Sequence, residues 1–195
     1  MSSNIESGIE MNVLIVYGTR YGATTSTAEE IANILRTENY AVKVVNLKEE
    51  KIKDISPYEL VIVGSGMQLG KWTSEAEDFL KKHREELSNK KLAIFASTMK
   101  MVPQKEGKPE EVEKIRKAAL DDIITKYNLH PISAGFFGGV LNYNRMNFLF
   151  RRTLGALKPQ LETDGFKETE QGVYELRDWD EIRGWAKELA VKAAS

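Results

Sequence analysis

The chain has 195 residues, a formal net charge of −1 and no cysteine. Its length predicts one α/β domain with an insertion, and its balanced charge gives no sign of a nucleic-acid-binding surface. Without cysteine, the chain cannot form disulfides, zinc sites built on thiolates or a cysteine nucleophile.

Residues 1–10 lack the basic start and the long apolar stretch of a secretory signal, and we predict that they form a disordered tail. Residues 11–195 are predicted to form a single domain. They contain no run of about 18 apolar residues, the length that a membrane-spanning helix needs. We therefore expect a cytoplasmic protein.

The first predicted strand, an apolar run over 13–16, ends in a loop rich in glycine and threonine. A helix predicted over 26–38 follows directly. The first amides of a helix lack partners and carry partial positive charge, so this loop predicts a cradle for a phosphate group, with hydroxyls from Thr19, Thr24 and Thr25. The alternative is an ordinary strand-to-helix turn with a threonine cap.

Strand and helix patterns alternate along the rest of the chain. We predict further strands over 40–47, 60–63, 92–96 and 131–137, and helices over 73–87, 109–127 and 179–193. Thr73 or Ser74 is the expected cap of the helix over 73–87, with Glu77 completing a capping box. Five strands joined in this way favour a flavodoxin-like doubly wound parallel sheet in the order 2-1-3-4-5, with an insertion after the fifth strand.

Three strand ends meet around one ligand in this topology, and strands one, three and four all end in loops of Gly, Ser or Thr. The stretch Gly64–Gly70 has the spacing G-x-G-x-x-x-G, which misses the dinucleotide fingerprint. The chain also lacks the G-x-x-x-x-G-K-[ST] motif of nucleotide triphosphatases, and its first strand does not end in the acidic residues of a response-regulator receiver. A flat heterocycle with a single phosphate fits these loops better.

Loops over 65–72 and 97–100 are expected to flank the ring of that heterocycle. Met67, Leu69 and Trp72 are the candidates for ring contact. Trp72 could instead pack at the start of its helix, because tryptophan is often buried without touching a ligand.

At this point the sequence resembles a known family. The run Thr19–Thr24 is similar to the flavodoxin FMN-phosphate loop T-x-[ST]-G-x-T, with Tyr21 at a position where a hydroxyl residue is usual. The chain most resembles the flavodoxin-like menaquinone-dependent protoporphyrinogen dehydrogenases, through its first loop, Gly64–Gly70, Gly139–Arg145 and the Asp178-Trp179 pair before the last helix.

This resemblance implies FMN as the cofactor. The residues that it implies for cofactor binding are Thr19, Arg20, Tyr21, Gly22, Ala23, Thr24, Thr25, Ser65, Gly66, Met67, Gln68, Leu69, Gly70, Trp72, Ser97, Thr98 and Met99. The flavin would carry the chemistry, so no catalytic side chain and no metal are expected.

The predicted insertion over 142–175 begins with a segment, 142–158, that combines basic and large apolar residues and has no acid. Such a segment can lie on an anionic membrane surface, grip an acidic hydrophobic substrate or dock to a partner. The alternative is a packing helix whose arginines are solvated. The residues expected to meet a substrate or a membrane are Asn142, Tyr143, Arg145, Arg151 and Arg152.

The resemblance implies an FMN-dependent oxidoreductase that passes electrons from a porphyrinogen-like substrate to a quinone. If 142–158 serves as the membrane contact, we expect it to bind peripherally at the inner face of the membrane. The first alternative is a flavodoxin-type electron carrier between protein partners. Such carriers are usually acidic, and this nearly neutral chain with a basic insertion favours the enzyme. A quinone reductase fed by a nicotinamide cofactor is the other alternative.

Overall fold

The computed structural model describes residues 11–146 and 148–195, and the predicted tail over 1–10 lies outside the described residues. Five parallel strands form the main sheet in the order β2-β1-β3-β4-β5, which confirms the predicted topology. The strands are β1 (Asn12–Gly18), β2 (Ala41–Asn46), β3 (Leu60–Gly66), β4 (Lys91–Thr98) and β5 (Ser133–Gly138).

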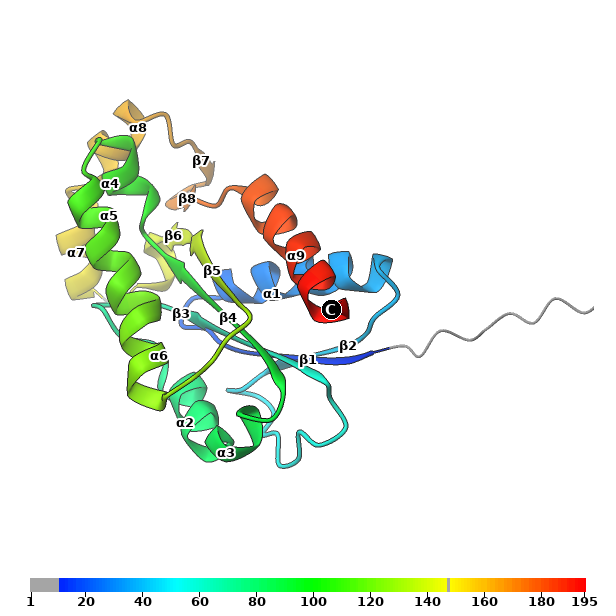
Figure 1. Cartoon of the computed structure of the whole chain (residues 1–195). Helices are drawn as coiled ribbons and strands as arrows, with labels where there is room; N and C mark the ends of the chain where they lie inside the picture. Colours follow the sequence, from blue (N-terminus) through cyan, green and yellow to red (C-terminus); the bar gives the residue numbers. More distant parts are fainter. Residues whose placement is uncertain (1–10, 147) are drawn as a thin grey trace, which may run out of the picture.

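Helices cover both faces of the main sheet (Figure 1). On one face lie α1 (Ala23–Thr37) and α9 (Trp179–Ala194), which share a core with β-strand residues such as Ile15 and Ile62. On the other face lie α2 (Ser74–Lys82), α3 (Arg84–Leu87), α5 (Pro109–Arg116), η1 (Lys117–Asp121) and α6 (Asp122–Tyr127). Because both faces of the central strands are covered, Val13–Val16 are fully buried, as their continuous apolar run predicts.

Two predicted helices are interrupted in the structure. The helix expected over 73–87 ends at Lys82, and α3 resumes after His83, whose buried ring lies 4.7 Å from the Phe79 ring between centroids. Thr73 is the cap, accepting from the Ala76 N–H, whereas the capping box is wrong. The Glu77 carboxylate instead accepts hydrogen bonds from Lys126 and the Tyr127 hydroxyl. Burial alone would raise the pKa of Glu77, but the hydrogen bonds from Lys126 and Tyr127 outweigh it and hold the pKa below its usual value.

The helix expected over 109–127 contains a π-helical turn, η1, between α5 and α6. The indole N–H of Trp72 donates to the Ala119 carbonyl of this turn at 2.7 Å. A π-turn changes the hydrogen-bond register of a helix, and here a carbonyl of the turn accepts from a side chain on the neighbouring element. A short helix, α4 (Met101–Lys105), precedes α5 and was not predicted.

The segment between β5 and α9 forms a small unit that we call the insertion subdomain, residues 140–175. It lies beyond the carboxyl ends of the main strands (Figure 1). Its elements are β6 (Val140–Asn142), η2 (Tyr143–Arg145), α7 (Phe148–Gly155), α8 (Lys158–Thr163), β7 (Glu168–Glu170) and β8 (Val173–Glu175). The three strands form an antiparallel sheet in the order β6-β8-β7 over a core that includes Leu141, Tyr143, Leu161 and Tyr174.

Within residues 11–146 and 148–195, we find no helix with the length and the apolar character needed to cross a bilayer.

Candidate functional site

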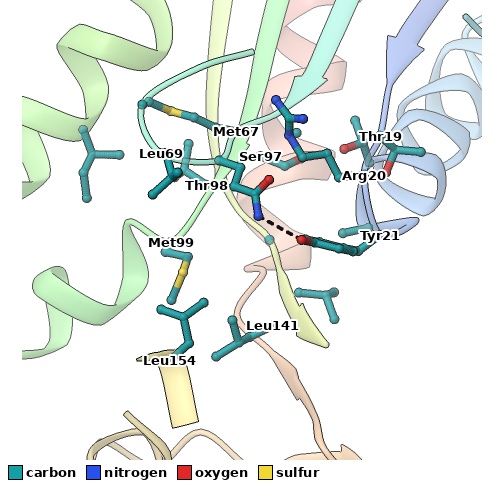
Figure 2. A pocket seen from close by; sticks show the side chains of 18 of the residues that line it. Thr19, Arg20, Tyr21, Met67, Leu69, Ser97, Thr98, Met99, Leu141 and Leu154 are labelled. Carbon is teal, nitrogen blue, oxygen red and sulfur yellow. Dashed lines mark hydrogen bonds between the residues drawn. The ribbon is translucent and has the colours of Figure 1, made fainter. Parts of the chain in front are cut away.

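A cavity of about 380 Å³ opens where β1, β3 and β4 end (Figure 2). Its wall is mainly apolar, and the loops that follow the three strands contribute most of it. Thirteen of the predicted cofactor residues line it: Thr19, Arg20, Tyr21, Ala23, Thr24, Gly66, Met67, Gln68, Leu69, Gly70, Ser97, Thr98 and Met99.

The loop after β1 leads directly into the N-terminus of α1, where no side chain caps the helix among the described residues. Gly22 is the N-terminal cap of α1 at a φ of 94°, a conformation that favours glycine. The Thr19 hydroxyl accepts a hydrogen bond from the Gly22 N–H at 2.9 Å and so fixes the loop. The first turn of α1 contains no acidic residue. This geometry leaves the positive end of a 15-residue helix facing the cavity mouth, where an anion is stabilised.

Arginine side chains connect this loop to its surroundings. Arg20 donates from Nη2 to the Trp72 carbonyl at 3.0 Å, which joins the loop to the start of α2. Arg177 donates from Nη1 to the Ala23 carbonyl at 3.2 Å and is paired with Glu175. Two guanidinium groups therefore lie near the start of α1, and that of Arg177 is paired with a carboxylate.

The loop after β3 is a tight turn that forms one side of the cavity. Gln68 and Lys71 are bridged, and Leu69 and Gly70 between them both have positive φ angles, of 51° and 73°. The Leu69 side chain is 78% exposed. The Gln68 side-chain amide donates to the Tyr21 hydroxyl at 2.8 Å, so this turn is tied to the loop after β1 across the cavity (Figure 2).

The carboxyl end of β4 carries an unsatisfied polar atom. The Ser97 Oγ is buried and has no hydrogen-bond partner among the described residues. By contrast, the Thr98 hydroxyl donates to the Phe137 carbonyl and accepts from the Lys100 N–H, both at 3.1 Å. A buried hydroxyl without a partner is costly, and its presence in the cavity wall fits a polar ligand bound there. Together with the cradle at α1 and the apolar wall, it fits a phosphorylated heterocycle.

Four predicted cofactor residues do not line the cavity. Gly22 and Thr25 belong to the cap and first turn of α1, beside residues that do. The Ser65 hydroxyl is fully buried and accepts from the Thr73 N–H at 2.9 Å, so it positions α2. Trp72 is 2% exposed and packs in the core under α2 and η1, which is the packing role that the sequence left open.

The five predicted insertion residues have separate roles in the structure. Asn142 caps η2, and its Oδ1 accepts from the amides of residues 144 and 145. Tyr143 is a core residue whose hydroxyl donates to the Leu154 carbonyl at 2.7 Å, and burial raises its pKa to about 12. Arg145 reaches the loop after β1, Arg151 donates to the Tyr143 carbonyl at 3.0 Å, and Arg152 is exposed.

The comparison with protein families gives a direct result. The model described as "Flavodoxin domain" matches residues 14–169, which is most of the chain. The chain belongs to the flavodoxin domain family. This membership indicates FMN as the cofactor and an oxidoreductase as the class of protein.

Two relatives among curated proteins carry the same name. "Protoporphyrinogen IX dehydrogenase [quinone]" of Escherichia coli (strain K12) is 24% identical over 182 residues, covering 92% of this chain and 95% of that protein. The protein with that name from Leishmania major is 27% identical over 186 residues, covering 91% of this chain and 74% of that protein.

Solved flavodoxins have the same fold. A short-chain flavodoxin associated with a non-canonical PDU bacterial microcompartment superposes with a TM-score of 0.55 at 16% identity, covering 95% of this chain and 99% of that chain. Oxidised flavodoxin 2 from Bacillus cereus gives a TM-score of 0.55 at 18% identity, covering 93% and 99%. These likenesses agree with the observed strand order.

The structure adds cavity residues that the sequence reasoning did not assign to the site. Lys114, Ile115 and Ala118 come from α5 and η1, and Gly139, Val140, Leu141, Met146 and Leu154 come from the chain after β5. The apolar content of the insertion was a usable signal for the second group, but no local pattern distinguishes an apolar residue that lines a cavity from one that packs.

Proposed function

We propose that this flavodoxin-family chain is an FMN-dependent oxidoreductase that removes hydrogen from a porphyrinogen-like substrate and delivers the electrons to a quinone. The observation that carries the proposal is the continuity of the cavity: the three strand-end loops and the insertion subdomain line the same space. The names of the two curated relatives support the same substrate and acceptor.

FMN would be held by groups that the cavity already presents. The amides that open α1, with the Thr19 and Thr24 hydroxyls, would take the phosphate. The loops over 66–70 and 97–99 would frame the ring, and Ser97 Oγ would gain the partner that it lacks. When bound, FMN supplies the redox chemistry, and the protein supplies binding, orientation and polarity around it.

The side chains beyond these loops suit a large apolar substrate with acidic substituents. Met99, Leu141 and Leu154 give the cavity an apolar wall (Figure 2). Lys114 and Arg20 stand in the same wall, where their charges favour a carboxylate. A porphyrinogen combines such a ring with propionates, so the chemical match covers both parts of the substrate.

Anaerobic turnover distinguishes this proposal from its alternatives. Purified protein loaded with FMN is given protoporphyrinogen with or without a menaquinone analogue, and porphyrin fluorescence is followed. We expect fluorescence to rise only with the quinone. Turnover that requires a redox protein would indicate an electron carrier, and quinone reduction driven by NADH or NADPH alone would indicate a nicotinamide-fed quinone reductase.

We also propose that 142–158 makes peripheral contact with a membrane, from which the quinone would come. Phe148 is 78% and Leu149 is 70% exposed, and they lie on α7 next to the basic pair Arg151 and Arg152. Exposed apolar side chains beside cations favour an anionic bilayer surface. Peripheral binding would bring the insertion subdomain, and the cavity that it lines, to the lipid phase.

Vesicle co-sedimentation tests this contact. Replacing Phe148 and Leu149 with serine leaves the backbone contacts of Arg151 intact, and we expect it to reduce binding to vesicles with anionic lipid. Reversing the charge of Arg151 and Arg152 to glutamate should reduce it further while FMN stays bound. The matched control reverses Lys51 and Lys53, two exposed lysines outside the subdomain. If the first two variants bound to the vesicles as wild type does, the segment would have only a packing role.

A further inference from the structure

Arg145 of the insertion subdomain lies directly against the loop that opens α1. Its Nη1 donates to the Tyr21 carbonyl at 3.0 Å. A Cβ built on Gly22 would come within 2.8 Å of the same nitrogen. The guanidinium therefore occupies the space beside the N-terminal cap of α1, although more than a hundred residues of sequence separate the two.

The backbone around Arg145 is fixed by contacts within the subdomain. Asn142 Oδ1 accepts from the Asn144 and Arg145 amides at 3.0 and 3.2 Å, and the Tyr143 N–H donates to the Gly172 carbonyl at 2.8 Å. The Tyr143 side chain is buried in the subdomain core. Arg145 therefore extends from a capped and anchored turn, so its position at the loop is built into the fold.

The electrostatics of this position point to an anion. The start of α1 carries partial positive charge, and its first turn has no acidic residue to balance it. A guanidinium next to a positive helix end is unfavourable by itself, but an anion held by the same amides makes it favourable. The Arg20 side chain points away from this loop and donates to the Trp72 carbonyl, whereas Arg145 reaches the loop from the insertion subdomain.

We propose that Arg145 is a binding residue of the cofactor's phosphate group, supplied by the insertion subdomain. This inference rests on the assignment of FMN to the cavity and deepens it: the insertion completes the cofactor site in addition to facing a substrate or a membrane. It also changes the expectation that Arg145 belongs with Arg151 and Arg152, because the guanidinium lies on the phosphate loop.

A comparison of FMN with riboflavin tests the proposal, because riboflavin has the same ring and no phosphate. Flavin fluorescence quenching gives the affinity of the apoprotein for each compound. We expect Arg145→Gln to weaken FMN binding about tenfold, the scale of a lost charge-assisted hydrogen bond, and to leave riboflavin binding unchanged. Arg145→Lys, which keeps the charge, should recover part of the loss, and added salt should reduce the difference between wild type and Arg145→Gln.

The matched control is Arg36→Gln, which removes the same charge from the last turn of α1, about 20 Å along the helix from its start. We expect no change in affinity for either flavin. An equal loss for FMN and riboflavin in Arg145→Gln would overturn the proposal in favour of a purely structural latch, and so would unchanged binding of both. Wild-type protein that binds FMN but does not oxidise porphyrinogen would overturn the proposed function alone.

Discussion

The main sheet and the insertion subdomain depend on each other unequally. Among the described residues, the two cores that flank the main sheet contain no residue of 140–175. The core of the subdomain, in contrast, includes Val102 from α4 and packs against Tyr21 and Met99 from the loops after β1 and β4. The cores of the main sheet are therefore formed without the insertion. The core of the insertion subdomain, in contrast, includes residues that follow the carboxyl ends of the main strands. Stability and function are thus linked more tightly in the subdomain than in the sheet.

The junction between the two regions is where a substitution should have the largest effect. A Cβ on Gly138, at the end of β5, would lie 1.9 Å from the Leu176 carbonyl oxygen. Because the obstacle is backbone, we expect Gly138→Ala to cost about 3 kcal/mol or more in urea unfolding. Gly155→Ala is the matched control, since no atom of the described residues lies within 4 Å of its Cβ position, and it should be neutral or slightly stabilising. Equal stability of the two variants would contradict the tight junction.

The second prediction concerns the core of the main sheet. Trp72→Phe removes the hydrogen bond to the Ala119 carbonyl and leaves a gap under η1. We expect a loss of about 2 kcal/mol in the free energy of unfolding, with FMN affinity unchanged. A fall in FMN affinity without a loss of stability would instead support the alternative prediction that Trp72 contacts the ring.

The third prediction concerns two buried tyrosines of the insertion subdomain at alkaline pH. Burial raises the pKa of Tyr143 and of Tyr174 to about 12, whereas a free tyrosine has a pKa of about 10. The neutral rings favour the fold, so this stability is fully present below pH of about 10 and is lost as the pH rises toward about 12. We expect unfolding in that window. Tyrosinate absorbance and near-UV circular dichroism, measured as a function of pH, monitor it. Tyr143→Phe should lose about 1 kcal/mol at neutral pH and show a weaker alkaline dependence. If wild type and Tyr143→Phe lost stability identically with rising pH, ionisation of Tyr143 would not be the cause of the alkaline unfolding.

The smallest effect on stability is expected at Ser97. Ser97→Ala removes a buried hydroxyl that has no partner among the described residues, so the apoprotein should be unchanged or slightly more stable. If the hydroxyl serves the cofactor, FMN affinity should fall about fivefold, the scale of one neutral hydrogen bond. Melting of the apoprotein and FMN titration measure the two effects separately. Unchanged affinity would remove Ser97 from the site.

The same contrast explains what the sequence could predict. The central strands β1, β3 and β4 are buried on both faces and read as apolar runs such as Val13–Val16. The order of the five strands follows from the alternation of strands and helices. The strands of the subdomain have three residues each. Their pairing, such as Val140 with Glu175, joins distant positions and leaves no local periodicity.

The candidate site divides along the same line. The loops after β1, β3 and β4 were predictable, because glycine and hydroxyl residues at strand ends mark them. The roles of Trp72 and Arg145 were not, because they depend on contacts with η1 and with the α1 cap that no spacing reveals. The breaks at His83 and in η1 coincide with tertiary contacts, of the His83 ring with the Ile52 carbonyl and of Trp72 with the Ala119 carbonyl, that helix periodicity does not reveal.

The pairing of Val140 with Glu175 brings the entry and the exit of the insertion side by side. The polypeptide thus leaves the main domain and returns to it at nearly the same point, so the insertion forms a closed excursion from the main domain. The entropy of closing such an excursion grows only with the logarithm of its length, about 0.6 kcal/mol for each doubling. A fold arranged in this way can lengthen, shorten or exchange the excursion during evolution with little effect on the scaffold, so new recognition can be acquired without rebuilding the redox module.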